Sequence, residues 1–542
     1  MSKIKIVQIL LTGGIVLVLN AHLNAQITGE NVEIIKNFDA RLLETDRLKV
    51  TPLLPPVDTT PKMQTYNINV KTSDVDYLPP KLRPLGIKTV KEEKGFNGYT
   101  KLGYGVPASP YGELAYSLSK AKQMDLGLYL RYHSAKLKSN PLQRFSETGG
   151  ALNGTYYHEP LGMGIGATIG YNHDNVFYYG YNKEVDTLTL EQGRQRYNLF
   201  DINARVFNSQ QTVGDFDYRA DIHFYRLTDK YAAGESGFDL NIGGSKWIAD
   251  RHTIDVKLIT DLTSFSDTAG TQSLTNIKLQ PAFTFRSDIF KIRLGLNLIS
   301  FKDEFYPQPD IEANLAIAGS ALSAYAGWKG DFVKNNMRSL TEYNPFVHTG
   351  RLDINNNQTQ RYYGGIKGNM KIFEYQVEAG YAKNKNLALF LTDGADLRRR
   401  FLTVYDTVNI FNINGTLTAS PMENLTMLVT ANQNFFTTTT QDKPWHLPRT
   451  ELNVGLRYAA MEKKLHLKGD LFLQDGLAYK DEGAQIGNLN ALLDLSLGAE
   501  YWMAENIGLF VDANNLLNNK RERWYRYPTY GINIIGGITA RF

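Results

Sequence analysis

The chain ends on residues 531–542, GINIIGGITARF, and this stretch decides the fold. Counted back from the end, every second position is apolar or aromatic except Gly536: Phe542, Ala540, Ile538, Ile534 and Ile532. The positions between them are mostly polar or glycine: Arg541, Thr539, Gly537 and Asn533, with Ile535 as the exception. A strand with one apolar and one polar face, closing the chain on an aromatic ring, is what a transmembrane β-barrel requires. We therefore predict that this stretch is the closing strand of such a barrel.

The same two-residue alternation recurs along the chain. In residues 162–172, Met, Ile, Ala and Tyr alternate with Gly, Thr and Asn, and in residues 291–298, Ile and Leu alternate with Lys, Arg, Gly and Asn. In a membrane barrel the apolar face meets lipid, and the charged positions line a wet lumen. The expected lumen-lining residues are the charged members of these strands: Asp255, Lys257, Arg293, Asp494 and Glu500.

The length of the alternating region sets the number of strands. A strand and its share of loop use about 20 residues, so residues 96–542 predict an all-β, antiparallel barrel of about 22 strands, with 18–20 as the alternative. Tight turns are expected at residues 287–288 and 461–463. Longer polar inserts are candidate extracellular loops: 175–195, 331–358, 393–400 and 515–527. The three asparagines 355–357 are interpreted as a loop tip.

The first 25 residues have the layout of a secretory signal peptide. Lys3 and Lys5 precede an apolar run at positions 6–19, and a short polar region ends at Ala25. A transmembrane anchor is the alternative, although the apolar run is shorter than the ~20 residues that a spanning helix needs. The chain has 0 cysteines, which excludes lipoprotein processing at a cysteine, disulfides and thiolate metal sites.

Residues 26–95 form a separate, proline-rich segment. They hold seven of the 19 prolines and lack long alternation, which predicts an extended periplasmic or lumen-filling segment. A short amphipathic helix over residues 31–43 is the alternative local structure.

Composition supports an outer-membrane barrel. The chain has 32 Tyr, 26 Phe and 46 Gly, as expected for interfacial aromatic girdles and tight turns. Its formal charge is only +4, and its basic residues are not clustered, so nucleic acid is not an expected partner.

Sequence motifs near the C-terminus resemble a known family. The run 506–519, NIGLFVDANNLLNN, followed by Trp524-Tyr525-Arg526-Tyr527-Pro528 and the closing strand, resembles the C-terminus of TonB-dependent receptors. Residues 99–117, LTEYNPF at 340–346 and YYGGIKG at 362–368 resemble relatives in Bacteroidota that lack a full plug domain. The resemblance implies a bacterial outer-membrane barrel whose partners are lipid, lipopolysaccharide and the barrel-assembly machinery, for which Phe542 is the signal.

Motifs of enzymes and cofactor sites are absent from the sequence. The 9 His form no metal-binding helix motif, and no phosphate-binding loop or nucleophile elbow occurs. No cofactor and no metal are therefore expected, although barrel lipases and proteases stay open as an alternative. Two loops are candidate surface-binding sites for lipopolysaccharide, phosphate, glycan or a partner: Arg398, Arg399 and Arg400, and Trp524, Tyr525 and Arg526. A solvated loop and an interface-anchoring loop base are the respective alternatives.

Three functions fit a barrel with these features. The first is a TonB-receptor-like protein that binds or transports a solute at the cell surface. The second is a structural or scaffold subunit of an outer-membrane export or assembly machine, with periplasmic or outer-membrane protein partners. The third is a passive diffusion pore.

Overall fold

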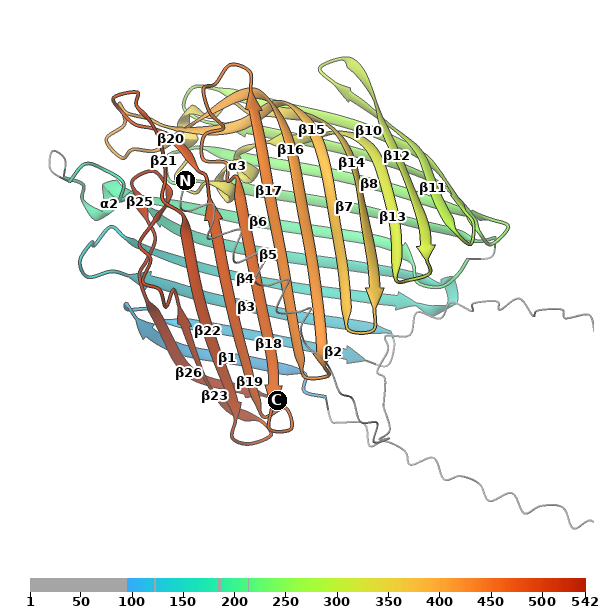
Figure 1. The fold of residues 1–542 in the computed structure, drawn as a ribbon, viewed down its shortest axis with the longest axis horizontal. Coiled ribbons are helices and arrows are strands. Elements are labelled where there is room, and N and C mark those ends of the chain that lie inside the picture. Colours follow the sequence, from blue (N-terminus) through green and yellow to red (C-terminus); the bar gives the residue numbers. More distant parts are fainter. Residues whose placement is uncertain (1–94, 121–122, 184–186, 213) are drawn as a thin grey trace, which may run out of the picture. The chain divides into compact units, whose positions relative to one another are not determined.

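The computed structural model describes residues 95–120, 123–183, 187–212 and 214–542 (Figure 1). The expected signal peptide, the proline-rich segment up to residue 94 and the alternative helix at 31–43 lie outside the described residues. Within this part of the chain, 22 strands form one antiparallel sheet. Its strands are β1 (Gly98–Val106), β2 (Tyr111–Lys120), β3 (Met124–Lys136), β4 (Arg144–His158), β5 (Met163–Phe177), β6 (Arg194–Asn208), β7 (Phe216–Thr228), β8 (Gly234–Ile248), β9 (His252–Ser266), β10 (Thr271–Arg286), β11 (Phe290–Phe301), β12 (Glu304–Ala318), β13 (Leu322–Asn335), β14 (Asn355–Met370), β15 (Phe373–Thr392), β16 (Phe401–Met422), β17 (Leu425–Thr438), β18 (Thr450–Ala460), β19 (Leu465–Asp475), β22 (Leu492–Trp502), β23 (Ile507–Asn514) and β26 (Asn533–Arg541).

The sheet closes on itself because its first and last strands pair. β1 and β26 run antiparallel, with Tyr99 opposite Arg541 and Val106 opposite Ile534. The seam continues to the end of the chain, where the amide of Gly98 donates to the carbonyl of Phe542 at 2.7 Å and the amide of Phe542 donates back at 3.0 Å. Every strand of the sheet therefore has two neighbours, and the prediction of 22 strands is confirmed.

Apolar side chains cover the outside of the barrel. Leu279 and Leu294 are 41% and 54% exposed, whereas their neighbours Gln280 and Arg293 line a cavity inside the barrel. This arrangement is the reverse of a soluble protein and confirms the expected membrane-facing surface. None of the helices in the described ranges is long and apolar enough to span a membrane.

The two ends of the barrel differ in their connections. At one end neighbouring strands are joined by short turns, such as those between β10 and β11 and between β18 and β19, where the sequence predicts them. The other end carries the long loops, which in barrels of this type are extracellular. These loops contain most of the short elements: α2 (Leu190–Gly193), α3 (Met337–Tyr343), η2 (Thr349–Arg351), the hairpin of β20 (Ala478–Lys480) with β21 (Ile486–Asn488), and that of β24 (Glu522–Trp524) with β25 (Tyr527–Pro528). The remaining one, η1 (Glu159–Leu161), lies in the turn between β4 and β5.

The interpretation of residues 355–357 as a loop tip is wrong. Asn355 opens β14, and Asn356 and Asn357 are 2% and 7% exposed. The side-chain amides of Asn356 and Asn276 exchange two hydrogen bonds, of 2.7 Å and 3.2 Å, across the interior. The side-chain amide of Asn356 therefore hydrogen-bonds to a buried partner rather than to water.

Candidate functional site

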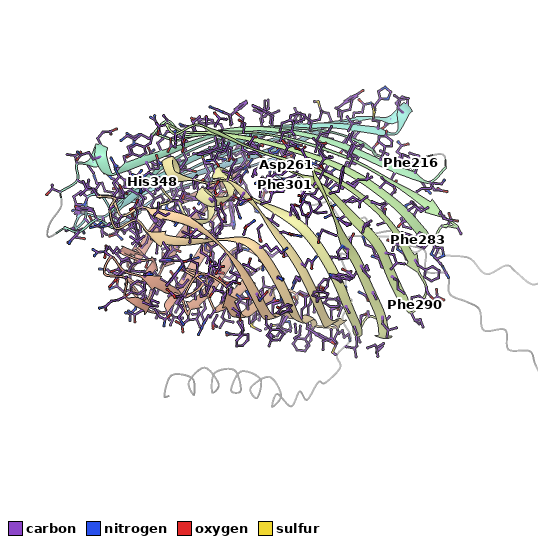
Figure 2. The ribbon with its side chains drawn as sticks, turned by 90° about the horizontal axis from the view of Figure 1, so that it is seen from above. Phe216, Asp261, Phe283, Phe290, Phe301 and His348 are labelled. Carbon is purple, nitrogen blue, oxygen red and sulfur yellow. The ribbon has the colours of Figure 1, made fainter. Side chains whose placement is uncertain are left out.

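The long loops fold inward and pack into one hydrophobic cluster at the extracellular end. We call this packed body the lid, and define it as residues 178–183 and 187–193, 336–354 and 515–532. Its buried side chains pack with those of the barrel wall: Tyr178, Tyr197, Leu227, Ala233, Phe265, Leu274, Met337, Leu340, Phe346, Val347, Leu352, Ile354, Phe390, Phe401, Trp524 and Tyr527. Figure 2 shows His348 at this end, with Phe216, Phe283 and Phe290 at the opposite end.

Aromatic rings join the loops of the lid to each other. The ring centroids of Phe346 and Tyr527 are 3.9 Å apart, and that of Tyr179 is 5.0 Å from Tyr527. Trp524 lies edge-on to Phe401 of the barrel wall at 5.4 Å. Such pairs add stability beyond the burial of their area, so the lid behaves as one packed unit.

Helix α3 is positioned by a buried carboxylate on the wall. Asn336 and Ser339 form a reciprocal capping box that starts the helix. The amides of Met337 and Arg338 then donate to Glu235 of β8 at 2.6 Å and 3.2 Å. An anion at a helix N-terminus satisfies free amides and the helix dipole, which fixes this end of the lid to the barrel.

Ion pairs below α3 strengthen the same attachment. The ammonium group of Lys334 lies 2.6 Å from Asp261 and 3.4 Å from Asp239, and the guanidinium group of Arg338 lies 3.0 Å from Asp201. Figure 2 shows Asp261 inside the barrel. The ring of His223 lies between two of these carboxylates, at 3.0 Å from Asp201 and 3.0 Å from Asp239.

The buried His446 links its own loop, β15 and β20 to the lid. The Nδ1–H group of His446 donates to the carbonyl of Phe390 at 3.0 Å, and its Nε2 accepts from the amide of Tyr525 at 3.2 Å. Its amide donates to the carbonyl of Ala478 at 2.9 Å. The two ring contacts require the neutral imidazole. Burial accordingly lowers the pKa of His446 from 6.5 to about 3, because a charged ring would lose its hydration.

Five of the cavities between the described residues lie along the interior, and four of them receive the predicted lumen residues. Asp255, Lys257 and Arg293 line one cavity of about 1060 Å³, in which Arg293 pairs with Asp255 at 3.2 Å. Asp494 lines a second cavity of about 450 Å³ beneath the lid, and Glu500 lines two others of about 310 Å³ and 800 Å³. The fifth, of about 550 Å³, lies beneath α3 and the ring of Phe346. The structure thus gathers three of the five residues in one place and distributes the other two.

The arginine-rich loop is largely occupied by internal contacts. Arg400 is 6% exposed, and its Nε lies 2.7 Å from Asp396. Burial alone would raise the pKa of Asp396, but the hydrogen bonds and charge of Arg400 outweigh it and lower that pKa. Arg399 lies 3.5 Å from Glu482, and Arg398 donates to the carbonyl of Gln192 at 2.8 Å. Arg400 is therefore not available to a surface ligand.

The second predicted surface loop belongs mostly to the lid. Trp524 is 4% exposed and packs inward, so it does not present its ring at the surface. Tyr525 stacks on Tyr479 with centroids 4.3 Å apart, and Arg526 pairs with Glu482 at 2.9 Å. These two residues are partly exposed and stay candidates for an outer contact.

Sequence reasoning missed several residues of this end of the barrel. His446, Phe145, Gln474 and Tyr530 come from four separate connections and strands, and they share no motif. The only signal for them is the position of Phe145 and Gln474 on the non-lipid face of their strands. In the described ranges, no group of three or more His, Cys, Asp or Glu residues is placed to hold a metal ion.

Comparisons with known proteins are informative at the level of structure. No protein-family model matches the chain, and no curated protein matches it. Solved structures do match: the FrpB iron transporter from Neisseria meningitidis (F3-3 variant) has a TM-score of 0.65 at 9% identity, over 83% of this chain and 82% of that one. A ferric enterobactin receptor, PfeA of Pseudomonas aeruginosa, has a TM-score of 0.60 at 11% identity, over 83% and 81%.

A third match extends the set to another organism. The alcaligin outer-membrane receptor FauA from Bordetella pertussis has a TM-score of 0.55 at 11% identity, over 83% of this chain and 76% of that one. These three proteins are one iron transporter and two receptors. At these identities the likeness concerns the fold, and it agrees with the apolar outer surface and the closed sheet. The barrel described here has the fold of the 22-strand TonB-dependent outer-membrane receptors.

Proposed function

We propose that this protein lies in the bacterial outer membrane, binds a solute at the cell surface and lets it pass through the barrel when the lid moves. The observation that carries the proposal is the lid itself. Its loops pack across the extracellular end, and two cavities, of about 550 Å³ and 450 Å³, lie beneath it. Roofed cavities of this size suit ligand capture.

A pore that is open at rest fits the same features poorly. The cluster joins β6, β7, β9 and β10 on one wall to β15 and β16 on another through α3 and the ring of Trp524, and its members are 0–9% exposed. Water and small ions would have to cross this packed body. Conduction therefore requires a rearrangement of the lid, which is the behaviour of a gated receptor rather than a diffusion channel.

Finer features of the proposal rest on the sequence. The resemblance supports a relative of the Bacteroidota type without a full plug domain, inserted by the barrel-assembly machinery that recognises Phe542. Lipopolysaccharide and a periplasmic or outer-membrane protein are the proposed partners. The lack of catalytic motifs in the sequence supports a protein that is not an enzyme.

Two measurements on the whole protein test the proposal. The tagged protein is purified from its native outer membrane in mild detergent and then inserted into planar bilayers. We expect recovery without stoichiometric partners and little conductance until lid contacts are removed, for example by Phe346→Ala with Trp524→Ala. Stoichiometric recovery with other barrels would instead support the scaffold function, and a large resting conductance would support the diffusion pore.

A further inference from the structure

The outward face of the wall formed by β3 to β7 carries charge at one end only. The outward positions of these strands are those that share a face with the exposed Leu130, Leu152, Ile169, Phe200 and Phe224. In these five strands, which the structure describes throughout, no outward position holds an aspartate or a glutamate. The lysines and arginines at outward positions all lie at the extracellular ends of their strands: Lys136, Arg144, Arg194, Arg196 and Arg226. We call these five residues the basic row.

Two tyrosines fix the level of the basic row relative to the membrane. Tyr132 and Tyr171 are 42% and 48% exposed on the outward face. Their hydroxyls donate towards the extracellular end, to Ser134 at 3.3 Å and to Asn198 at 3.3 Å. Tyrosines with an apolar body and a polar tip mark the boundary between lipid and water. The bases of β3, β4 and β6 lie beyond this boundary and that of β7 lies level with it, so the basic row lies at the depth of lipid head groups.

Members of the basic row are placed so that they repel one another. Lys136 and Arg144 are direct partners across β3 and β4. Arg194 and Arg196 share one face of β6, about 7 Å apart along the strand. Like charges in such positions destabilise a sheet, and an anion bound between them removes the repulsion.

The described residues supply little negative charge to the basic row. Glu191 of α2 lies 2.8 Å from Lys230 and 3.9 Å from Arg194. Of the five bases, only Arg194 forms an ion pair with a described residue. The side chain of Glu191 is 72% exposed, and surface pairs of this kind are weak. The basic row therefore keeps a net positive charge that an outside anion can neutralise.

Neighbouring strands show that the charge is local to this wall. Arg226 lies opposite Ser236 of β8, which lies opposite Ser264 of β9, which in turn lies opposite Ser273 of β10. The outward face at this level is thus basic on β3 to β7 and uncharged on the next three strands. Figure 1 shows β3 to β6 side by side, with α2 at their extracellular end.

We propose that the basic row binds the phosphate groups of a phosphorylated glycolipid of the outer leaflet, the lipid A part of lipopolysaccharide. The guanidinium groups donate paired hydrogen bonds to phosphate oxygens, and the acyl chains lie along the apolar side chains of the same strands, such as Leu130 and Leu152. The row crosses four gaps between strands of about 4.8 Å each, which gives room for more than one phosphate.

This inference rests on the outer-membrane location in the proposed function and assigns a site to one of its proposed partners. The site is on the outer wall, away from the cavities beneath the lid. It therefore requires neither a particular solute nor an open lid.

Native mass spectrometry of the purified full chain in an uncharged detergent tests the inference. The probes are bis-phosphorylated lipid A and the same molecule without its phosphates. We expect the phosphorylated form to bind and the other to bind about 100-fold more weakly, since several contacts of about 5-fold each are lost. Arg226→Gln should weaken binding of the phosphorylated form by about 5-fold, and Lys136→Gln with Arg194→Gln and Arg226→Gln by about 100-fold.

Two further variants separate charge from folding. Arg194→Lys with Arg226→Lys keeps both charges and should retain most of the binding. Lys302→Gln removes an exposed base from the extracellular turn between β11 and β12, outside the basic row, and should leave binding unchanged. Heat-modifiable electrophoresis confirms that each variant is folded.

Three results would overturn the inference. They are equal binding of lipid A with and without phosphates, unchanged binding by the folded triple variant, and displacement of lipid A by inorganic phosphate at equal concentration. The last result would identify a site for free phosphate rather than for a lipid.

The bilayer conductance of the lid variants separates this inference from the proposed function. If lipid A binds regardless of its phosphates, but conductance still depends on the lid contacts, the lipid site is wrong and the receptor function stands. If the native protein fractionates with the inner membrane, both fall together.

Discussion

The ring of Phe346 stacks on that of Tyr527, with centroids 3.9 Å apart and planes inclined by 23°. The two residues belong to loops that are far apart in the sequence, between β13 and β14 and between β23 and β26. Tyr527 also donates a hydrogen bond to the carbonyl of Arg398 at 3.0 Å, which brings in a third loop. Movement of any one loop must therefore break contacts with the others, and the lid opens as a unit or not at all.

Locking this stack should stop solute passage. The chain has 0 cysteines, so Phe346→Cys with Tyr527→Cys creates a single reactive pair. Joining the pair with a short bismaleimide should abolish solute flux in proteoliposomes while leaving the barrel folded on heat-modifiable electrophoresis. Each single variant treated with the same reagent serves as the control. Undiminished flux through the joined protein would show that solutes pass elsewhere.

Acid should loosen the lid through His446. Its pKa is about 3 in the packed lid and returns to 6.5 when the lid opens, so the open form binds more protons. The stability of the closed lid is therefore complete above pH 6.5 and is lost progressively as the pH drops from 6.5 towards 3. Fluorescence of the buried Trp445 and Trp524 in the purified protein, followed against pH, measures this opening.

A neutral replacement provides the comparison for the acid effect. His446→Gln retains hydrogen-bonding capacity but cannot take up a proton in this range. It should remove the pH dependence between 3 and 6.5 even if the lid is less stable throughout. An unchanged acid transition in this variant would assign the effect to other groups.

The barrel could be predicted from the sequence because its signal is local. Each outward side chain, such as Leu279, and its inward neighbour Gln280 report the two faces of a strand without knowledge of any distant contact. Chain length then sets the strand number. The closing strand at Phe542 adds the final constraint, since β1 has to meet it.

The lid could not be predicted in the same way because its contacts join distant loops. The segment KRERWYRY at 520–527 has the composition of a surface loop, yet Trp524 is buried against Phe401 and Phe390. Arg400 is buried because Asp396, four residues earlier, pairs with it. Gln474 and Tyr530 line one cavity only because β19 and the loop before β26 meet in the folded barrel.

Removal of Lys334 should weaken the attachment of α3. Lys334→Met leaves Asp239 and Asp261 facing each other without their shared cation, at side chains that are 21% and 11% exposed. The expected loss is about 2–3 kcal/mol, less than for a fully enclosed pair because lumen water reaches the site. The thermal midpoint of the barrel measures it. Lys257→Met, at an exposed lumen position, is the control, and Lys334→Met with Asp261→Asn should recover part of the loss. Equal midpoints for Lys334→Met and the control would contradict this role.

A charge on the outer surface of β10 should distinguish the two faces of the wall. Leu279 is 41% exposed on the apolar side, so Leu279→Arg places a guanidinium in lipid and should cost about 2–4 kcal/mol near the bilayer centre. Gln280→Arg introduces the same group one residue later, into the wet cavity, and should lose only about 1 kcal/mol with the 3.1 Å hydrogen bond from Gln280 to Asn297. Unfolding by denaturant in lipid vesicles measures both variants. Because both variants introduce the same guanidinium at adjacent positions, a larger loss at Gln280 than at Leu279 would mean that the apolar face does not meet lipid.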